Sequence, residues 1–103
     1  HEPGGFAMQE NENELTPAET ERLAVLSEEM GEAIQVIGKI LRHGYVSTHP
    51  NGGPNNRRLL EKELGDVRHA MIRMCEAGDL NKDTIHAEAE AKRETVEKYL
   101  HHQ

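Results

Sequence analysis

The chain has 103 residues and a formal net charge of −7, with 35% hydrophobic and only 3% aromatic residues. This length accommodates one domain with a small core, and the excess of acid argues against nucleic acid as a partner, because phosphate backbones are bound through clustered lysines and arginines. No apolar run approaches the roughly 20 residues that span a bilayer, so we expect no membrane partner.

Residues 1–15 are predicted to form a disordered or expression-derived N-terminal segment, and residues 16–103 a helical domain. The domain opens with a helix start in which Thr16 is the N-cap, Pro17 is the first helical residue and Glu19 completes a capping box. Apolar residues then recur at steps of three and four, which predicts a first amphipathic helix to about Arg42, ended by His43 and Gly44.

The stretch 47–56 is dense in Gly, Pro and Asn and is predicted to be a loop. A second helix is predicted to start near Asn55 or Asn56 and to end at Gly78. Its cysteine, Cys75, is the only one in the chain, so no intrachain disulfide is expected, and we interpret it as a small core residue in a cytoplasmic protein.

The third predicted helix follows a short connection, so we expect it to turn back on the second, with Asp83 as its N-cap. Its expected packing positions are Ile85, Ala89, Val96, Tyr99 and Leu100. No strand-like alternation is present. The predicted fold class is therefore all-α: an antiparallel helical bundle of three principal helices, completed by oligomerisation, because one subunit has little apolar area to bury.

Carboxylates interrupt the apolar stripes of the first two helices, where an unpaired charge is costly. Since each residue advances roughly 100° around a helix, Glu29 and Glu63 point into the packing face, and Glu32 and Asp66 lie at its margin. Residues three apart share a side of the helix, so these are two convergent pairs. Four carboxylates from two packed helices suit Mg²⁺, or Mn²⁺ as a substitute.

Further charged residues surround this predicted metal site. Glu28 lies on the polar side of the first helix. On the third helix, Lys92 falls within the apolar stripe and Arg93 at its side, so both are predicted to face the carboxylates. The structural alternative is a buried salt bridge from Glu29 or Glu63 to Lys92 or an arginine.

The pattern Glu28-Glu29-x-x-Glu32 followed by Glu63-x-x-Asp66 resembles the signature of the MazG-like, all-α nucleoside triphosphate pyrophosphohydrolases. The likeness covers most of the first two helices. It implies metal-dependent hydrolysis of a nucleoside triphosphate between its α and β phosphates, with release of a monophosphate and pyrophosphate. It also implies that the last four carboxylates of the pattern bind Mg²⁺, that Glu28 binds a further metal or orients the attacking water, and that subunits form a homodimer or homotetramer. For this reaction, Lys92 and Arg93 are the residues predicted to hold phosphate oxygens.

Three other interpretations stay open. The chain is alternatively a non-catalytic helical module with a structural metal site or a partner-binding apolar face. A di-iron site is suggested by His69, three residues after Asp66, but it falls on the polar side and the first helix has no matching histidine. Arg57 and Arg58 are within reach of a phosphate, although surface placement is favoured. Base selectivity is expected in the 43–56 loop, the early first helix and a neighbouring subunit.

Overall fold

A computed structural model describes residues 13–103, and its regular elements within that range are helices. They are α2 (Pro17–His43), α3 (Asn56–Glu76), α4 (Lys82–Thr95) and a short 3₁₀ helix, η1 (Val96–Tyr99). The all-α class with three principal helices is thus confirmed for the described residues. The prediction for residues 1–15 lies mostly outside them. None of the described helices has the length and apolar character needed to cross a membrane.

The first two helices begin where the sequence predicts. At the start of α2, Thr16 Oγ1 accepts a hydrogen bond from Glu19 N–H at 3.1 Å, and Glu19 Oε1 accepts one from Thr16 N–H at 2.7 Å, which completes the capping box. At the start of α3, Asn55 Oδ1 accepts a hydrogen bond from Arg58 N–H at 2.9 Å. α2 ends at Gly44, whose φ of +87° is readily adopted only by glycine.

The start of α4 differs from the prediction. Asn81, not Asp83, is the N-cap, because its Oδ1 accepts a hydrogen bond from Thr84 N–H at 2.9 Å. Asp83 lies instead in the first turn, where its negative charge is favourable at the positive end of the helix dipole. Asn81 and Asp83, two residues apart, are both good caps, and the one that meets a backbone donor starts the helix.

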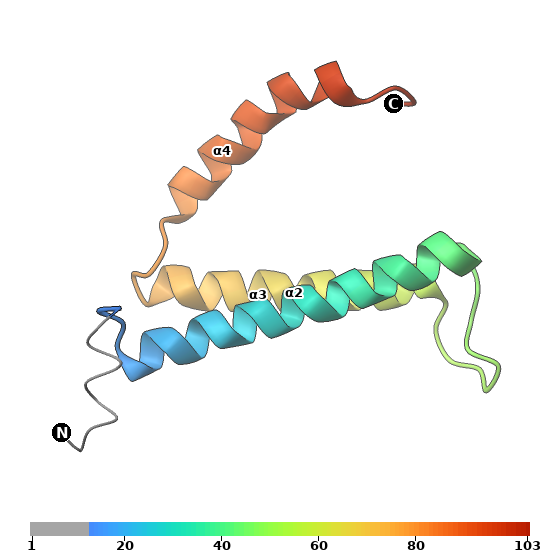
Figure 1. Cartoon of the computed structure of the whole chain (residues 1–103), viewed down its shortest axis with the longest axis horizontal. Coiled ribbons are helices and arrows are strands. Elements are labelled where there is room, and N and C mark those ends of the chain that lie inside the picture. The colour runs from blue at the N-terminus through green and yellow to red at the C-terminus, as the bar shows by residue number, and fades with distance from the viewer. Residues whose placement is uncertain (1–12) are drawn as a thin grey trace.

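α2 and α3 lie side by side and antiparallel (Figure 1), and their contact holds the buried core. The buried apolar side chains are Ala33 and Val36 of α2 with Ala70 and Met74 of α3. A bidentate ion pair closes one end of the pair, since Arg22 Nε and Nη2 donate to the Asp79 carboxylate at 2.6 and 3.0 Å. This core is small because it uses only one face of each helix.

Hydrogen bonds close the base of the loop between α2 and α3, at the opposite end of the helix pair. Asn56 N–H donates to Ser47 O and Arg57 N–H to Tyr45 O, each at 2.9 Å. The buried Asn56 side chain donates from Nδ2 to Gly44 O at 3.1 Å. The Arg57 guanidinium lies 4.7 Å above the centre of the Tyr45 ring. The loop is therefore fixed at its base.

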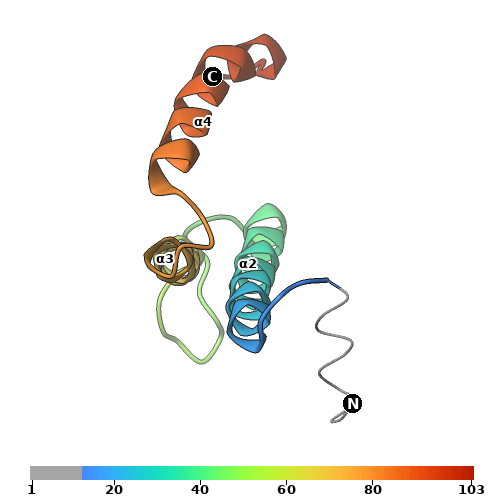
Figure 2. The same ribbon diagram turned by 90° about the vertical axis from the view of Figure 1, so that its left-hand side faces the viewer.

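α4 projects away from the other two helices in both views (Figures 1 and 2). The prediction that it turns back on α3 is wrong for the single chain. Of its expected packing residues, Tyr99 remains 76% exposed and Leu100 45% exposed. The physical reason is that α4 offers few large apolar side chains to compete with its charges, while the Arg22–Asp79 ion pair and the Asn81 cap fix the connection before it.

Candidate functional site

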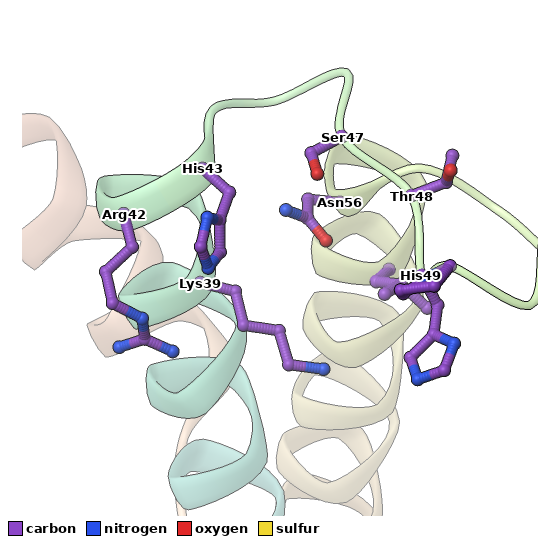
Figure 3. A pocket seen from close by; sticks show the side chains of 9 residues that line it. Lys39, Arg42, His43, Ser47, Thr48, His49 and Asn56 are labelled. Atoms are coloured by element: carbon purple, nitrogen blue, oxygen red, sulfur yellow. The ribbon is translucent and has the colours of Figure 1, made fainter.

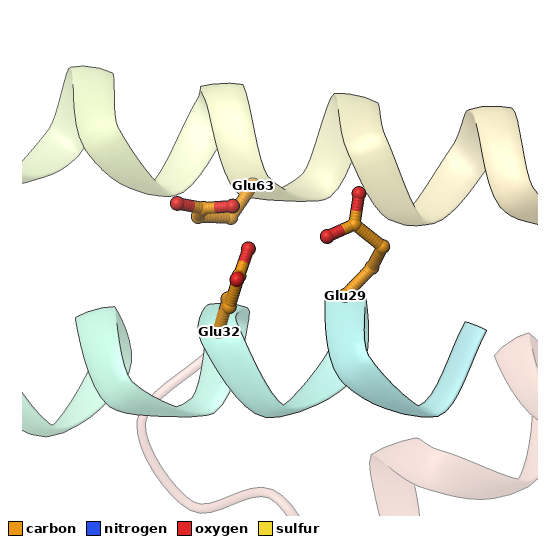
Figure 4. A group of neighbouring side chains, drawn as sticks. All are labelled: Glu29, Glu32 and Glu63. Carbon is orange, nitrogen blue, oxygen red and sulfur yellow. The ribbon is translucent and has the colours of Figure 1, made fainter. Parts of the chain in front are cut away.

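Three carboxylates meet across the α2–α3 contact. Glu29 and Glu32, one turn apart on α2, point toward Glu63 on α3 (Figure 4). One carboxylate oxygen from each lies within 4.8 Å of the other two. We call these three residues the acidic cluster. It forms because residues three apart share a helix face and the antiparallel pairing brings Glu63 opposite them.

Glu63 holds the least satisfied charge of the acidic cluster. Its side chain is 16% exposed, and its Oε1 is buried with no hydrogen-bond partner among the described residues. Lys62 Nζ lies 3.8 Å from this oxygen, beyond hydrogen-bond distance. A buried carboxylate oxygen without a donor is costly, so this position favours a bound cation.

The crowding of carboxylates in the acidic cluster affects the pKa of Glu29. Burial raises the pKa of the Glu29 carboxyl, and hydrogen bonding with Glu32 and the negative charge of Asp66 raise it further. Each of these effects disfavours the ionised form of the Glu29 carboxyl. A divalent cation reverses this balance, because it favours the ionised carboxylates.

Asp66 lies beside the acidic cluster and is paired with a cation of its own helix. Lys62 Nζ donates to Asp66 Oδ2 at 2.8 Å, and this hydrogen bond raises the pKa of the Lys62 ammonium, together with the charges of Asp66 and Glu63. Three of the four predicted metal ligands are therefore gathered, and the fourth is adjacent. Lys62 is absent from the predicted site, although its spacing of four residues from Asp66 is the signal that finds it.

The remaining predicted site residues lie elsewhere. Glu28 is exposed on α2. Lys92 and Arg93 are exposed on α4, where Arg93 Nη1 lies 3.7 Å from Glu90 Oε1. The prediction that these two basic residues face the carboxylates is wrong within a single chain, because α4 projects away from the helix pair. The alternative salt bridge from Glu63 or Glu29 to Lys92 is absent from the described residues for the same reason.

A cavity of about 430 Å³ lies at the loop end of the groove between α2 and α3 (Figure 3). Its lining residues are Lys39, Arg42, His43, Ser47, Thr48, His49, Pro50, Asn56 and Leu59. We call it the basic cavity, because four of its lining residues are lysine, arginine or histidine and none is acidic. Lys39 extends from α2 across the groove toward α3. The volume is within the range of small-ligand sites, roughly 300–1,000 Å³.

The two sites belong to one groove. Lys39 follows Glu32 by seven residues, which is two helical turns or roughly 10 Å along the same face of α2. The predicted role of the 43–56 loop in contacting substrate does not include Lys39 or Arg42. The signal for Lys39 in the sequence is this spacing of seven from an inward-facing carboxylate, and Arg42 follows Lys39 by three residues. Arg57, a predicted alternative for reaching phosphate, instead stacks on Tyr45.

Comparison of the chain with protein-family models, with curated proteins and with solved structures gives no match in any of the three. The resemblance to the MazG-like enzymes therefore rests on the motif residues alone. The geometry of the acidic cluster stands independently of that resemblance, since it follows from the distances between Glu29, Glu32 and Glu63.

Proposed function

We propose that this protein is a metal-dependent nucleoside triphosphate pyrophosphohydrolase. It would cleave the bond between the α and β phosphates and release a nucleoside monophosphate and pyrophosphate. The observation that carries the proposal is the acidic cluster, with three convergent carboxylates and one buried, unpartnered oxygen on Glu63. The resemblance of the motif to the MazG-like family supplies the reaction.

The residues fit a hard divalent cation such as Mg²⁺, because every donor is a carboxylate oxygen. Glu29, Glu32 and Glu63 would hold the ion, and Asp66 would join them on release from Lys62. When bound, Mg²⁺ neutralises phosphate charge and lowers the pKa of a coordinated water. Mn²⁺ takes similar ligands and would substitute for it.

The chain's own residues then have distinct roles in the proposed reaction. The oxygen of a water molecule bonds to the α phosphorus, and the bond from that phosphorus to the α–β bridging oxygen breaks in line. Glu28, which is exposed on α2 and directly precedes Glu29 in the chain, accepts the proton of the water. Lys62, beside Glu63 and Asp66, supplies positive charge to the phosphate oxygens.

We propose that the protein acts in the cytoplasm, where a lone cysteine stays reduced. Exposed apolar side chains support assembly of the subunits into a homodimer or homotetramer. On α2, Ile34 is 66% and Leu41 82% exposed, and the apolar stripe of α4 is uncovered. Contiguous exposed apolar surface is typical of interfaces between subunits. A neighbouring subunit would complete the helical bundle, and its arrival would let Lys92 and Arg93 of one chain approach the acidic cluster of another.

The same exposed faces favour a second candidate function, a non-catalytic module that binds a protein partner and keeps the acidic cluster as a structural ion site. Both candidates include a bound ion. They differ in whether pyrophosphate is formed, so catalysis is the decisive measurement.

The direct test is incubation of the full chain with mixed nucleoside triphosphates and Mg²⁺, followed by detection of pyrophosphate. We expect release of pyrophosphate that Glu63→Gln reduces by about 100-fold or more. Glu61→Gln is the matched control, because it removes the same charge from an exposed position of α3 and should leave the rate unchanged. No pyrophosphate from any nucleotide would favour the module, and equal loss in both variants would refute the site.

A further inference from the structure

The basic cavity is a concentration of positive charge on a chain whose net charge is −7. Lys39 and Arg42 form no ion pair with a carboxylate of the described residues. This differs from Arg22, Lys62 and Arg93, each of which lies within 4 Å of one. Cations that line a cavity and lack an internal anion are available to an anionic ligand.

Local hydrogen bonds orient two polar side chains of the basic cavity, His49 and Asn56. His49 Nδ1 accepts a hydrogen bond from Asn51 N–H at 3.1 Å, so the neutral ring carries its proton on Nε2 and offers a donor there. Asn56 uses its amide donor on Gly44 O and lends rigidity to the wall. The cavity therefore presents ammonium, guanidinium and imidazole N–H groups, the donor set that binds phosphate oxygens.

The lining is less suited to a nucleobase. It contains no Phe, Tyr or Trp on which a base would stack, and Leu59 and Pro50 are its only apolar side chains. Its position matters as much as its composition, because it lies two helical turns from the acidic cluster in the same groove. A triphosphate whose α phosphate is at the acidic cluster can extend its other phosphates toward Lys39.

We propose that the basic cavity binds the β and γ phosphates of the substrate, the half that leaves as pyrophosphate; this rests on the proposed function. Breaking the α–β bond places new negative charge on the leaving group, and Lys39 and Arg42 stabilise that charge. The site takes over the phosphate-holding role predicted for Lys92 and Arg93, within a single chain. Its ligand class is a diphosphate.

The test measures binding of inorganic pyrophosphate to the full chain by calorimetry, with a chelator present so that no metal ion links the ligand to the acidic cluster. We expect Lys39→Gln and Arg42→Gln each to weaken binding about tenfold. The matched controls Lys98→Gln and Arg68→Gln remove the same charges from exposed positions outside the basic cavity, and should bind as the wild type does. All four positions are exposed, and circular dichroism checks that the variants fold.

Further ligands identify what the basic cavity binds. Inorganic phosphate should bind more weakly than pyrophosphate, and a nucleoside monophosphate should show no dependence on Lys39. A monophosphate that loses affinity in Lys39→Gln as pyrophosphate does would assign the cavity to the α phosphate and overturn the proposal. Pyrophosphate affinity that is equal in wild type, cavity variants and controls, or absent in all, would overturn it as well.

This result separates from the fate of the proposed function. If no nucleotide is hydrolysed but pyrophosphate binding depends on Lys39 and Arg42, the diphosphate site stands and the hydrolase proposal fails. If nucleotides are hydrolysed, Lys39→Gln should raise KM for the triphosphate and weaken inhibition by added pyrophosphate by similar factors. Unchanged KM and inhibition in an active Lys39→Gln enzyme would overturn the diphosphate site while the hydrolase stands.

Discussion

All three principal helices are capped, but α2 and α3 bury part of their apolar faces against each other, whereas α4 projects away from both. α2 and α3 share a core around Met74, and the Arg22–Asp79 ion pair fixes one end of their contact. α4 also has a sound N-cap at Asn81, but Tyr99 of the following η1 and Leu100 after it remain exposed. Helix formation is thus decided locally by caps, whereas burial needs a partner of sufficient apolar area. From this comparison we propose that α4 has its partner in another subunit.

The largest expected effect tests that partner directly. Ala89→Asp places a charge on the apolar stripe of α4, and Ala91→Asp places the same charge on its polar side. We expect the wild type and Ala91→Asp to be oligomers and Ala89→Asp to dissociate to monomers. In the proposed oligomer a neighbouring subunit covers the apolar stripe that holds Ala89, and it does not cover the polar side that holds Ala91. Light scattering after size-exclusion chromatography gives the masses. A monomeric wild type, or equal masses for all three, would contradict this account.

A second contrast separates core within a chain from core between chains. Met74→Ala should lower the free energy of unfolding by about 2 to 4 kcal/mol, because it opens a cavity at a buried position. Ile85→Ala on α4 should cost less, and its cost should grow as the protein is diluted, since dissociation is then coupled to unfolding. Urea unfolding at several protein concentrations measures both. If the effect of Ile85→Ala did not depend on protein concentration, Ile85 would pack within its own chain and not against a neighbouring subunit.

Charge within the pair gives a smaller effect of opposite sign. Glu29→Gln should raise the Tm of the metal-free protein at neutral pH and remove most of the stabilisation by Mg²⁺. The wild-type carboxyl has a folded pKa above its ordinary 4.5, so metal-free stability falls as pH rises through that interval and stays lower above it. Glu61→Gln, on an exposed part of α3, should change neither quantity. Thermal melts with chelator and with saturating Mg²⁺ decide the point.

The smallest expected effect concerns the ion pair between Arg22 and Asp79, which closes one end of the α2–α3 contact. Arg22 hydrogen bonds hold the pKa of Asp79 below its ordinary 3.8. Its contribution to stability is therefore present above about pH 3.8 and is lost as pH falls through the lower folded value. Asp79→Asn should melt below the wild type at pH 7, and the two curves should converge in acid. A Tm difference that persists at the lowest pH would assign the effect to shape rather than charge.

Much of the fold follows from the sequence because caps and periodicity act over a few residues. The Thr16 capping box, the Asn55 cap and the turn at Gly78 all occur where they are predicted. The N-cap of α4 is missed by two residues, since Asn81 and Asp83 are both good caps and only geometry chooses between them.

The candidate site also has a part that local spacing predicts and a part that depends on how the helices pack. Glu29, Glu32 and Glu63 converge because their spacing places them on facing helix sides. Asp66 turns to Lys62, a local pair that competes with the metal site. The placement of Lys92 opposite the carboxylates fails because it depends on how a third helix docks, which apolar periodicity alone does not specify.

The hydrogen-bonded base of the loop after α2 has a consequence for how the protein can change during evolution. Gly44, Tyr45 and Ser47 accept the hydrogen bonds that hold the two ends of the loop together. The tip around Gly52 and Gly53 can therefore be exchanged or lengthened without disturbing α2 or α3. The tip begins beside His49 and Pro50, which line the basic cavity. Insertions there would reshape one wall of that cavity and leave the carboxylates of the acidic cluster untouched. Under the proposed function, ligand preference and bond cleavage could then diversify separately.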